Sequence, residues 1–170
     1  MIHQGEEPCL LGEEGSGRYG AGAIFFTGCN LRCVFCQNFA ISRRPKGTPM
    51  DSAALRREME ALIAQGAENI DLVTPTQYLP TILPALEAPL PMPVVYNCGG
   101  YERVETLRAL EGQVDIYLPD LKYADNNLAA RLSYAGDYFY VAQRAILEMC
   151  RQTGPVQWQG DRVTRGVIIR

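Results

Sequence analysis

The feature that most restricts the fold of this chain is a regular alternation of short apolar segments with amphipathic ones. Compact runs of aliphatic and aromatic residues have the length and composition of buried strands. Each is followed by a segment whose apolar residues recur with the helical period. The expected strands are 23–28, 69–75, 93–97 and 114–120, and the expected helices are 51–66, 77–88, 102–112 and 137–154. About four such repeats predict βαβ units, and therefore an α/β fold with a parallel sheet.

Two of the expected helices carry strong patterns. The apolar residues of the first stand at positions i, i+4, i+7 and i+8: Leu55, Met59, Leu62 and Ile63. Asp51 or Ser52 can cap its start, and Gly66 its end. The segment 137–154 has a continuous apolar stripe, made of Tyr138, Val141, Ala142, Ala145, Ile146, Met149 and Cys150. Cys150 is therefore expected in the core.

The two ends of the chain differ from its middle. Residues 1–22 are rich in glycine and glutamate and are expected to be irregular, so that a single α/β domain covers 23–170. Residues 155–170 are expected to form a β-hairpin that turns at 160–161 and ends in the apolar run 167–169. Because this run starts a strand just before the sequence stops, we expect a fragment whose two open sheet edges favour aggregation or dimerisation.

Charge and hydropathy exclude several classes of protein. The formal net charge of −3, from 16 basic and 19 acidic residues, argues against a nucleic-acid partner. No run of about 18 apolar residues occurs, so no membrane span is expected. The first residues lack the basic and apolar regions of a signal peptide. We therefore expect a cytoplasmic protein, in which clustered cysteines bind metal or do chemistry rather than form disulfides.

Three of the six cysteines stand close together, as Cys29-x3-Cys33-x2-Cys36, directly after the first expected strand. Ligands of parallel α/β folds bind at the carboxyl ends of strands. A redox pair would use only Cys33 and Cys36. A zinc site needs a fourth ligand, and the only histidine, His3, is far away in the sequence. Three core thiols fit a polar loop poorly, whereas three thiolates suit a four-iron cluster with one iron open for a substrate or cofactor.

The cysteine spacing, with an aromatic residue at Phe35, resembles the signature of the radical S-adenosylmethionine (SAM) superfamily. The phrases "GCNLRCVFCQN", "LVTPTQYLP", "YNCGGYE" and "DIYLPDLKYAD" resemble its activase-like branch, related to the pyruvate formate-lyase activating enzyme. The resemblance extends over nearly the whole chain. It implies a partial TIM-like barrel with parallel strands, of about four complete βα units and the start of a fifth strand.

The resemblance also implies an activity and its cofactors. The open iron of a [4Fe–4S] cluster would bind the amino and carboxylate groups of SAM. One electron from the reduced cluster would then cleave SAM into methionine and a 5′-deoxyadenosyl radical. In activases this radical takes a hydrogen atom from a backbone glycine of a partner protein. The implied partners are therefore a glycyl-radical enzyme and a low-potential electron donor of the flavodoxin or ferredoxin type.

Matched residue by residue, Cys29, Cys33 and Cys36 correspond to the cluster ligands. Phe35 corresponds to the aromatic residue beside the adenine of SAM. Arg170 matches an arginine at the start of the fifth strand that lies near SAM.

Five further matches lie at strand ends. Thr74 and Thr76 stand where relatives carry a Gly-Gly-Glu-like segment for the SAM amino group, and Asn97 stands where relatives have an aspartate. Asp120 and Lys122 match an Asp-x-Lys pair at SAM and the peptide substrate. Each of the five also has an ordinary structural interpretation as a strand-end, turn, capping or solvated residue. The missing charges support an alternative, a cluster-holding binding or electron-transfer module that does not cleave SAM.

Overall fold

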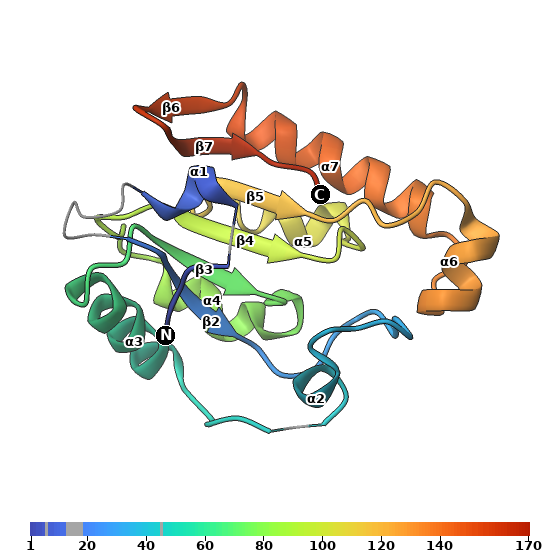
Figure 1. Cartoon of the computed structure of the whole chain (residues 1–170), viewed down its shortest axis with the longest axis horizontal. Coiled ribbons are helices and arrows are strands. Elements are labelled where there is room, and N and C mark those ends of the chain that lie inside the picture. Colours follow the sequence, from blue (N-terminus) through green and yellow to red (C-terminus); the bar gives the residue numbers. More distant parts are fainter. Residues whose placement is uncertain (6, 13–18, 45) are drawn as a thin grey trace.

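A computed structural model describes residues 1–5, 7–12, 19–44 and 46–170 of the chain. The described part is built around a seven-stranded sheet with the strand order β1-β2-β3-β4-β5-β7-β6 (Figure 1). Five inner strands run parallel: β2 Ala21–Phe25, β3 Asn69–Val73, β4 Val94–Cys98, β5 Ile116–Pro119 and β7 Arg162–Val167. Two short outer strands are antiparallel: β1 Ile2–His3 and β6 Gln157–Gln159. The predicted α/β fold with a mostly parallel sheet is confirmed.

The main helices cover one face of this sheet. The helical elements are α1 Pro8–Leu11, α2 Phe39–Ser42, α3 Ser52–Ala64, the 3-10 turn η1 Thr76–Tyr78, α4 Leu79–Ala85, α5 Val104–Arg108, α6 Asn126–Ser133 and α7 Tyr138–Thr153. The largest core cluster joins α3, α4, α7 and the end of α5 to one row of strand residues in register: Ile24, Leu72, Tyr96, Tyr117 and Val167. A doubly wound sheet would instead carry helices on both faces. No described helix has the length and hydropathy needed to cross a membrane.

The helical patterns predicted four helices that are present, although α4 and α5 are shorter than the expected 77–88 and 102–112, and they made one error of burial. All four predicted apolar positions of α3 are buried. The Asp51 carboxylate caps α3 by accepting a hydrogen bond from the Ala54 amide at 2.7 Å. In α7, however, Cys150 is exposed. It lies about 100° around the helix from the buried Met149, which turns its thiol away from the sheet. The prediction that Cys150 is a core residue is wrong.

Residues 1–22 contain more regular structure than expected. Strand β1 pairs with β2 through Ile2 and Gly22, and β2 itself begins at residue 21. The single turn α1 places Leu10 against Val95 and Ile116, on the sheet face opposite the main helices. Elements this short have no detectable period, which is why the sequence pattern missed them. Residues 13–18 of the expected irregular segment lie outside the described residues.

The predicted C-terminal hairpin is present, but its second strand has an additional partner. Strand β7 pairs antiparallel with β6 and parallel with β5, through Ile116 and Gly166. The fifth parallel strand is therefore the hairpin strand itself, and no new strand begins at 167. Arg170 lies beyond the carboxyl end of this strand, which corrects its expected position at the start. In the described part of the sheet, short strands also occupy both edges that were expected to be open.

Helix α6 is an element that the sequence analysis does not predict. Asp125 caps its start by accepting a hydrogen bond from the Asn127 amide at 2.7 Å. Tyr134 ends it in the left-handed conformation, at a φ of 57°. Figure 1 shows α6, in orange, at the end of the molecule where the blue loop after β2 also lies. This position brings α6 to the same end of the molecule as the loop that contains the three clustered cysteines.

Candidate functional site

A cavity of about 800 Å³ lies at the carboxyl ends of the parallel strands. Its volume falls within the range of about 300–1,000 Å³ that is usual for small-molecule sites. All of the predicted site residues except Thr76 line it: Cys29, Cys33, Phe35, Cys36, Thr74, Asn97, Asp120, Lys122 and Arg170. The fold thus gathers side chains from the loop after β2 and from the ends of the four following parallel strands.

The cysteine loop is anchored at its start to the end of β3. The Phe26 amide donates to the Val73 carbonyl at 3.0 Å, which continues the pairing of the two strands. The side-chain amide of Gln77 lies within hydrogen-bond distance of the carbonyl oxygens of Thr27, Gly28 and Thr74, at 2.8, 3.1 and 3.0 Å. Gln77 was not singled out from the sequence, because only the fold brings it beneath the loop.

The middle of the same loop is anchored to the end of α6. The Arg32 amide donates to the Ser133 carbonyl at 3.1 Å, and the Val34 amide donates to the Leu132 carbonyl at 2.8 Å. Cys33 lies between these two bonds and is buried. Two elements distant in sequence therefore fix the loop, β3 on one side and α6 on the other.

Each of the three thiols has a polar neighbour at sulfur. The Ser133 hydroxyl donates to Cys33 Sγ at 2.9 Å, and the Leu31 amide donates to Cys29 Sγ at 3.4 Å. Cys36 Sγ lies 3.4 Å from the Ser42 hydroxyl. Burial raises the pKa of the Cys29 thiol, and the hydrogen bond from the Leu31 amide opposes that rise. Metal binding would take the proton from such a thiol, because thiolate is the ligand form.

The possible metal donors at this cavity are mainly thiols. Within the described ranges, no three histidine, cysteine or acidic side chains converge on one metal-sized point. A four-iron cluster is wider than one ion and takes its thiolates at separate corners. Cys29, Cys33 and Cys36 are free thiols around one cavity, as a cluster requires.

A chain of polar side chains crosses the strand ends beside the thiols. The Asn97 amide donates to Asp71 Oδ2 at 3.2 Å and accepts from Arg170 Nη2 at 2.7 Å. Arg170 Nε lies 3.2 Å from Asp120 Oδ1, and Lys122 Nζ forms an ion pair with Asp120 Oδ2. Two acidic and two basic side chains are therefore joined through one amide, so Asn97 links β3 to the segment after β7 without a charge of its own.

Asp71 belongs to this series of hydrogen-bonded polar side chains, and it was not predicted from the sequence. Its side chain is fully buried within β3. A buried carboxylate needs partners, and Asn97 supplies one of them. An acid between the apolar residues Ile70 and Leu72, in the buried strand "NIDLV", is the signal that could have revealed it.

Thr74 and Thr76 have different surroundings. Thr74 lines the cavity with a φ of 59°, a conformation unfavourable for a β-branched residue, and its amide donates to the Asn97 carbonyl at 2.8 Å. Thr76 lies outside the cavity lining, and its hydroxyl donates to Glu102 Oε1 at 2.7 Å. Burial raises the pKa of Glu102 to about 7. Thr76 thus holds a buried acid that the sequence analysis did not single out.

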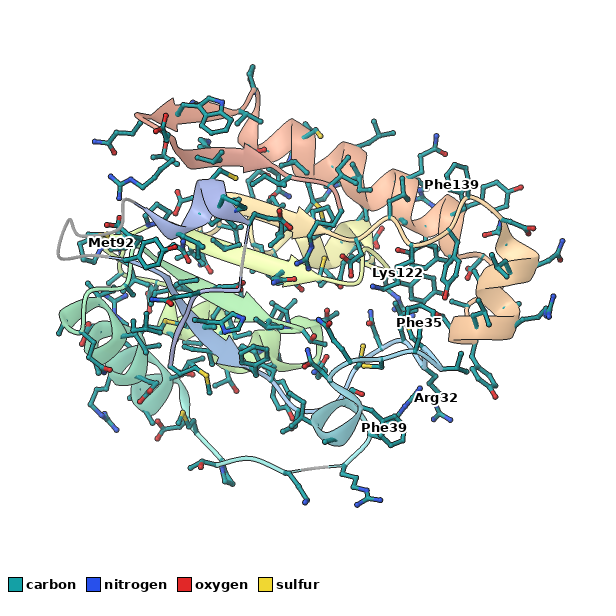
Figure 2. The ribbon with its side chains drawn as sticks, viewed as in Figure 1. Arg32, Phe35, Phe39, Met92, Lys122 and Phe139 are labelled. Carbon is teal, nitrogen blue, oxygen red and sulfur yellow. The ribbon has the colours of Figure 1, made fainter. Side chains whose placement is uncertain are left out.

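The cavity wall also contains a histidine and an exposed aromatic residue. His3 lines the cavity from β1, so its distance in sequence was a poor guide to its distance in space. The Phe35 ring meets Tyr123 edge to face, with 6.3 Å between ring centroids, and remains 55% exposed. Figure 2 shows Phe35 and Lys122 toward the same end of the molecule, with Arg32 and Phe39 below them in the view.

The fold and the cavity define a class: α/β proteins whose clustered thiols lie at the carboxyl ends of parallel strands. The chain belongs to the radical SAM superfamily, whose family model matches residues 23–158. It is also similar to the uncharacterized protein MJ0674 of Methanocaldococcus jannaschii, with 36% identity over 153 residues. That alignment covers 85% of this chain but 43% of the relative, so the chain spans less than half the length of the protein it matches.

Members of the radical SAM superfamily are generally enzymes with iron–sulfur, SAM-dependent radical chemistry. Members of this superfamily generally use a [4Fe–4S] cluster and SAM, and commonly need a reductant. The donor set around the cavity agrees with those needs.

Proposed function

We propose that Cys29, Cys33 and Cys36 hold a [4Fe–4S] cluster and that the chain cleaves SAM reductively beside it. When bound, the cluster supplies the electron that cleaves SAM to methionine and a 5′-deoxyadenosyl radical. One observation carries the proposal: three free thiols and the polar ends of four parallel strands line the same cavity.

The other lining residues would bind and orient SAM. The Thr74 hydroxyl can accept a hydrogen bond from the SAM ammonium, and the Phe35 ring offers a face to the adenine. Asp120, Lys122 and Arg170 form an ion-paired group, which presents charges of both signs to a ligand that carries a carboxylate, an ammonium and a sulfonium. Asn97 holds Arg170 in that group. Side chains already fixed by one another lose little freedom when a ligand binds.

A finer proposal concerns architecture and partner. Strands β2, β3, β4, β5 and β7 are neighbours in sequence order, with the main helices on one face, as in part of a TIM-like barrel. Within the family we propose an activase-like role, in which the radical takes a hydrogen atom from a glycyl-radical partner enzyme. The Asp120–Lys122 ion pair at the cavity supports it, because this pair matches the Asp-x-Lys motif of the activase-like branch.

The electron would come from an acidic low-potential carrier of the flavodoxin or ferredoxin type. Residues 21–50 contain no acidic residue but four basic ones, Arg32, Arg43, Arg44 and Lys46, in a chain of net negative charge. Val34, Phe35 and Phe39 of the same segment are more than half exposed. A segment that combines exposed apolar side chains with positive charges only would suit a negatively charged protein partner. Free thiols suit a reducing compartment, and we propose the cytoplasm.

Anaerobic reconstitution with iron and sulfide, followed by reduction with SAM present, tests the main proposal. The parent chain should take up iron and release 5′-deoxyadenosine. Cys29→Ala, Cys33→Ala and Cys36→Ala should lose most of the iron, whereas Cys150→Ala, an exposed thiol on α7, should keep it. Equal iron in the parent and in all three variants would refute the cluster assignment.

The same assay separates the alternative, a cluster-holding module without SAM cleavage. A reconstituted chain that takes up and gives back electrons but releases no 5′-deoxyadenosine would favour that alternative. The observation that supports this alternative is that the segment from Thr74 to Thr76 and Asn97 are neutral where relatives carry charge.

A further inference from the structure

One of the three thiols differs from the others in what contacts its sulfur. Cys33 Sγ accepts a hydrogen bond from the Ser133 hydroxyl at 2.9 Å, and Ser133 Oγ lies 2.7 Å from the Tyr123 hydroxyl. Both hydroxyl-bearing residues are buried, with exposed fractions of 1% for Ser133 and 6% for Tyr123. They come from α6 and from the segment before it, about 100 residues away from the cysteine loop in the sequence.

The direction of these hydrogen bonds follows from proton counting. A thiolate has no proton and can only accept. Ser133 has a single hydroxyl proton, which it donates to Cys33 Sγ. The hydrogen bond between Tyr123 and Ser133 must then be donated by Tyr123. Two buried hydroxyl groups therefore donate one after the other, Tyr123 to Ser133 and Ser133 to the Cys33 sulfur.

We propose that the Tyr123–Ser133 pair raises the reduction potential of the cluster by stabilising the charge that arrives on reduction. This rests on the proposed function, since it takes Cys33 to be a cluster ligand. Hydrogen bonds to cluster sulfurs are among the known determinants of iron–sulfur potentials. A donor acts more strongly in a buried, low-dielectric site, and a second hydroxyl polarises the first.

The remaining thiols provide an internal comparison. Ser42 lies 3.4 Å from Cys36 Sγ, at a half-buried place, and its hydroxyl also reaches the Phe39 carbonyl at 3.5 Å. The contact between Ser42 and Cys36 is longer than the one between Ser133 and Cys33. The Ser42 hydroxyl is also shared with the Phe39 carbonyl and is open to water. Removing the Ser42 hydroxyl should therefore change the potential far less than removing the Ser133 hydroxyl, although both changes are Ser→Ala beside a cysteine.

The change at Ser133 can be made without detaching the loop. The loop hydrogen bonds to α6 use the backbone carbonyls of Ser133 and Leu132, which Ser133→Ala keeps. That variant leaves the buried Tyr123 hydroxyl short of one partner. Tyr123→Phe avoids this, because it removes the outer hydroxyl and leaves Ser133 in place. The double variant removes both hydroxyls and leaves neither group unsatisfied.

The test is a redox titration of the full chain after anaerobic reconstitution, followed by electron paramagnetic resonance. At a fixed solution potential, Ser133→Ala should lower the ratio of reduced to oxidised cluster about tenfold. This corresponds to a reduction potential lower by about 59 mV for a one-electron couple. Tyr123→Phe should shift the ratio in the same direction by a smaller factor, and the double variant should match Ser133→Ala. Ser42→Ala should stay within about twofold of the parent, and all four variants should keep the iron content of the parent.

A second measurement, the magnetic coupling of the reduced cluster to nearby deuterons, does not depend on the stability of the variant. In deuterated buffer, the reduced parent cluster should show couplings to exchangeable deuterons, and the one from the Ser133 hydroxyl should be lost in Ser133→Ala while that from the Leu31 amide on Cys29 Sγ remains. Unchanged potentials in Ser133→Ala and Tyr123→Phe, at full iron content, would overturn the proposal while leaving the proposed function intact. A parent chain that takes up no iron would overturn both. If Ser133→Ala does not fold, the potential of Tyr123→Phe decides.

Discussion

Among single residues outside the cavity lining, Glu102 is a buried acid. It is 2% exposed, accepts a hydrogen bond from Thr76 and lies 3.5 Å from the Tyr96 hydroxyl. Burial raises its pKa to about 7. For an acid this means that the folded state holds the proton more tightly than the unfolded state. Its contribution to stability is therefore fully present below about pH 4.5 and is lost as the pH rises toward 7.

We expect Glu102→Gln to remove that loss. Between pH 5 and pH 8 the parent should lose about 3 kcal/mol more stability than the variant, given about 1.4 kcal/mol for each unit of pKa. Thermal unfolding of the cluster-free chain at both pH values measures this. Glu105→Gln, an exposed acid three residues further on, is the matched control. A parent and a Glu102→Gln variant with parallel pH profiles would show that Glu102 is ionised like any surface acid.

Asp120 is the residue on which the polar chain of the cavity depends, since it pairs with both Lys122 and Arg170. Asp120→Asn keeps its shape and removes its charge. We expect SAM affinity to fall about tenfold, or about 1.4 kcal/mol, with iron content unchanged. Isothermal titration of the reconstituted chain with SAM measures the affinity.

The control for this prediction is Asp115→Asn, at the opposite end of β5. Asp115 also lies near an arginine, with 3.9 Å between its Oδ1 and Arg165 Nη1, but it does not line the cavity. Its replacement should leave SAM affinity unchanged. Iron loss in Asp120→Asn as severe as in Cys29→Ala would instead give Asp120 a role in holding the fold.

At the scale of elements, α6 and the cysteine loop form one unit, and Tyr134 is its strained point. Tyr134 has a φ of 57°, which glycine adopts without cost, and its side chain is 73% exposed. Tyr134→Gly should stabilise the chain by about 1 kcal/mol, or about 2–4 °C in melting temperature. Tyr140→Gly, the same change inside α7, should destabilise it by a similar amount. Circular dichroism melts distinguish the two, and equal shifts of the same sign would contradict the strain argument.

Elements in which an apolar pattern repeats over several turns were predictable from the sequence, and short elements were not. Helix α3 has four core residues at helical spacing and a capping aspartate, so its sequence alone defines it. Helix α6 has only two buried residues, Ala129 and Ser133, and owes its place to contacts with the cysteine loop. Strand β7 was predicted as part of a hairpin, but its parallel pairing with β5 depends on topology, which a local pattern does not contain.

The residues of the candidate site show the same difference between local patterns and the effects of topology. The three cysteines are close in sequence, so their spacing was enough to predict a shared role. Asp71 and His3 reach the site region through strand order and pairing, which no local motif encodes. Thr76 was matched by sequence position, yet the turn of η1 directs its hydroxyl to Glu102 and away from the cavity lining.

At the scale of the whole molecule, charge is distributed unevenly, and this bears on the rate of reduction. Arg44 is exposed within the basic segment 21–50, eight residues after Cys36 in the sequence. Arg44→Glu should slow cluster reduction by an acidic carrier about tenfold at low ionic strength, with little effect at high salt. Reduction by a small chemical reductant should not change.

Arg57→Glu is the matched control, because it makes the same charge change on the exposed side of α3. Stopped-flow absorbance at several ionic strengths measures both variants. Equal slowing by Arg44→Glu and Arg57→Glu would mean that only net charge matters and that the basic segment is not a docking surface.

The anchoring of the cysteine loop to α6 also sets an order of events during synthesis. The serine that contacts Cys33 is added 100 residues after it. At about 5–20 residues per second, the three thiols leave the ribosome roughly 5–20 s before the helix that fixes their loop. During that interval they are unprotected nucleophiles on an incomplete domain. We therefore expect metal loading to follow completion of α6, and growth in oxygen to lower the yield of loadable protein before folding ends.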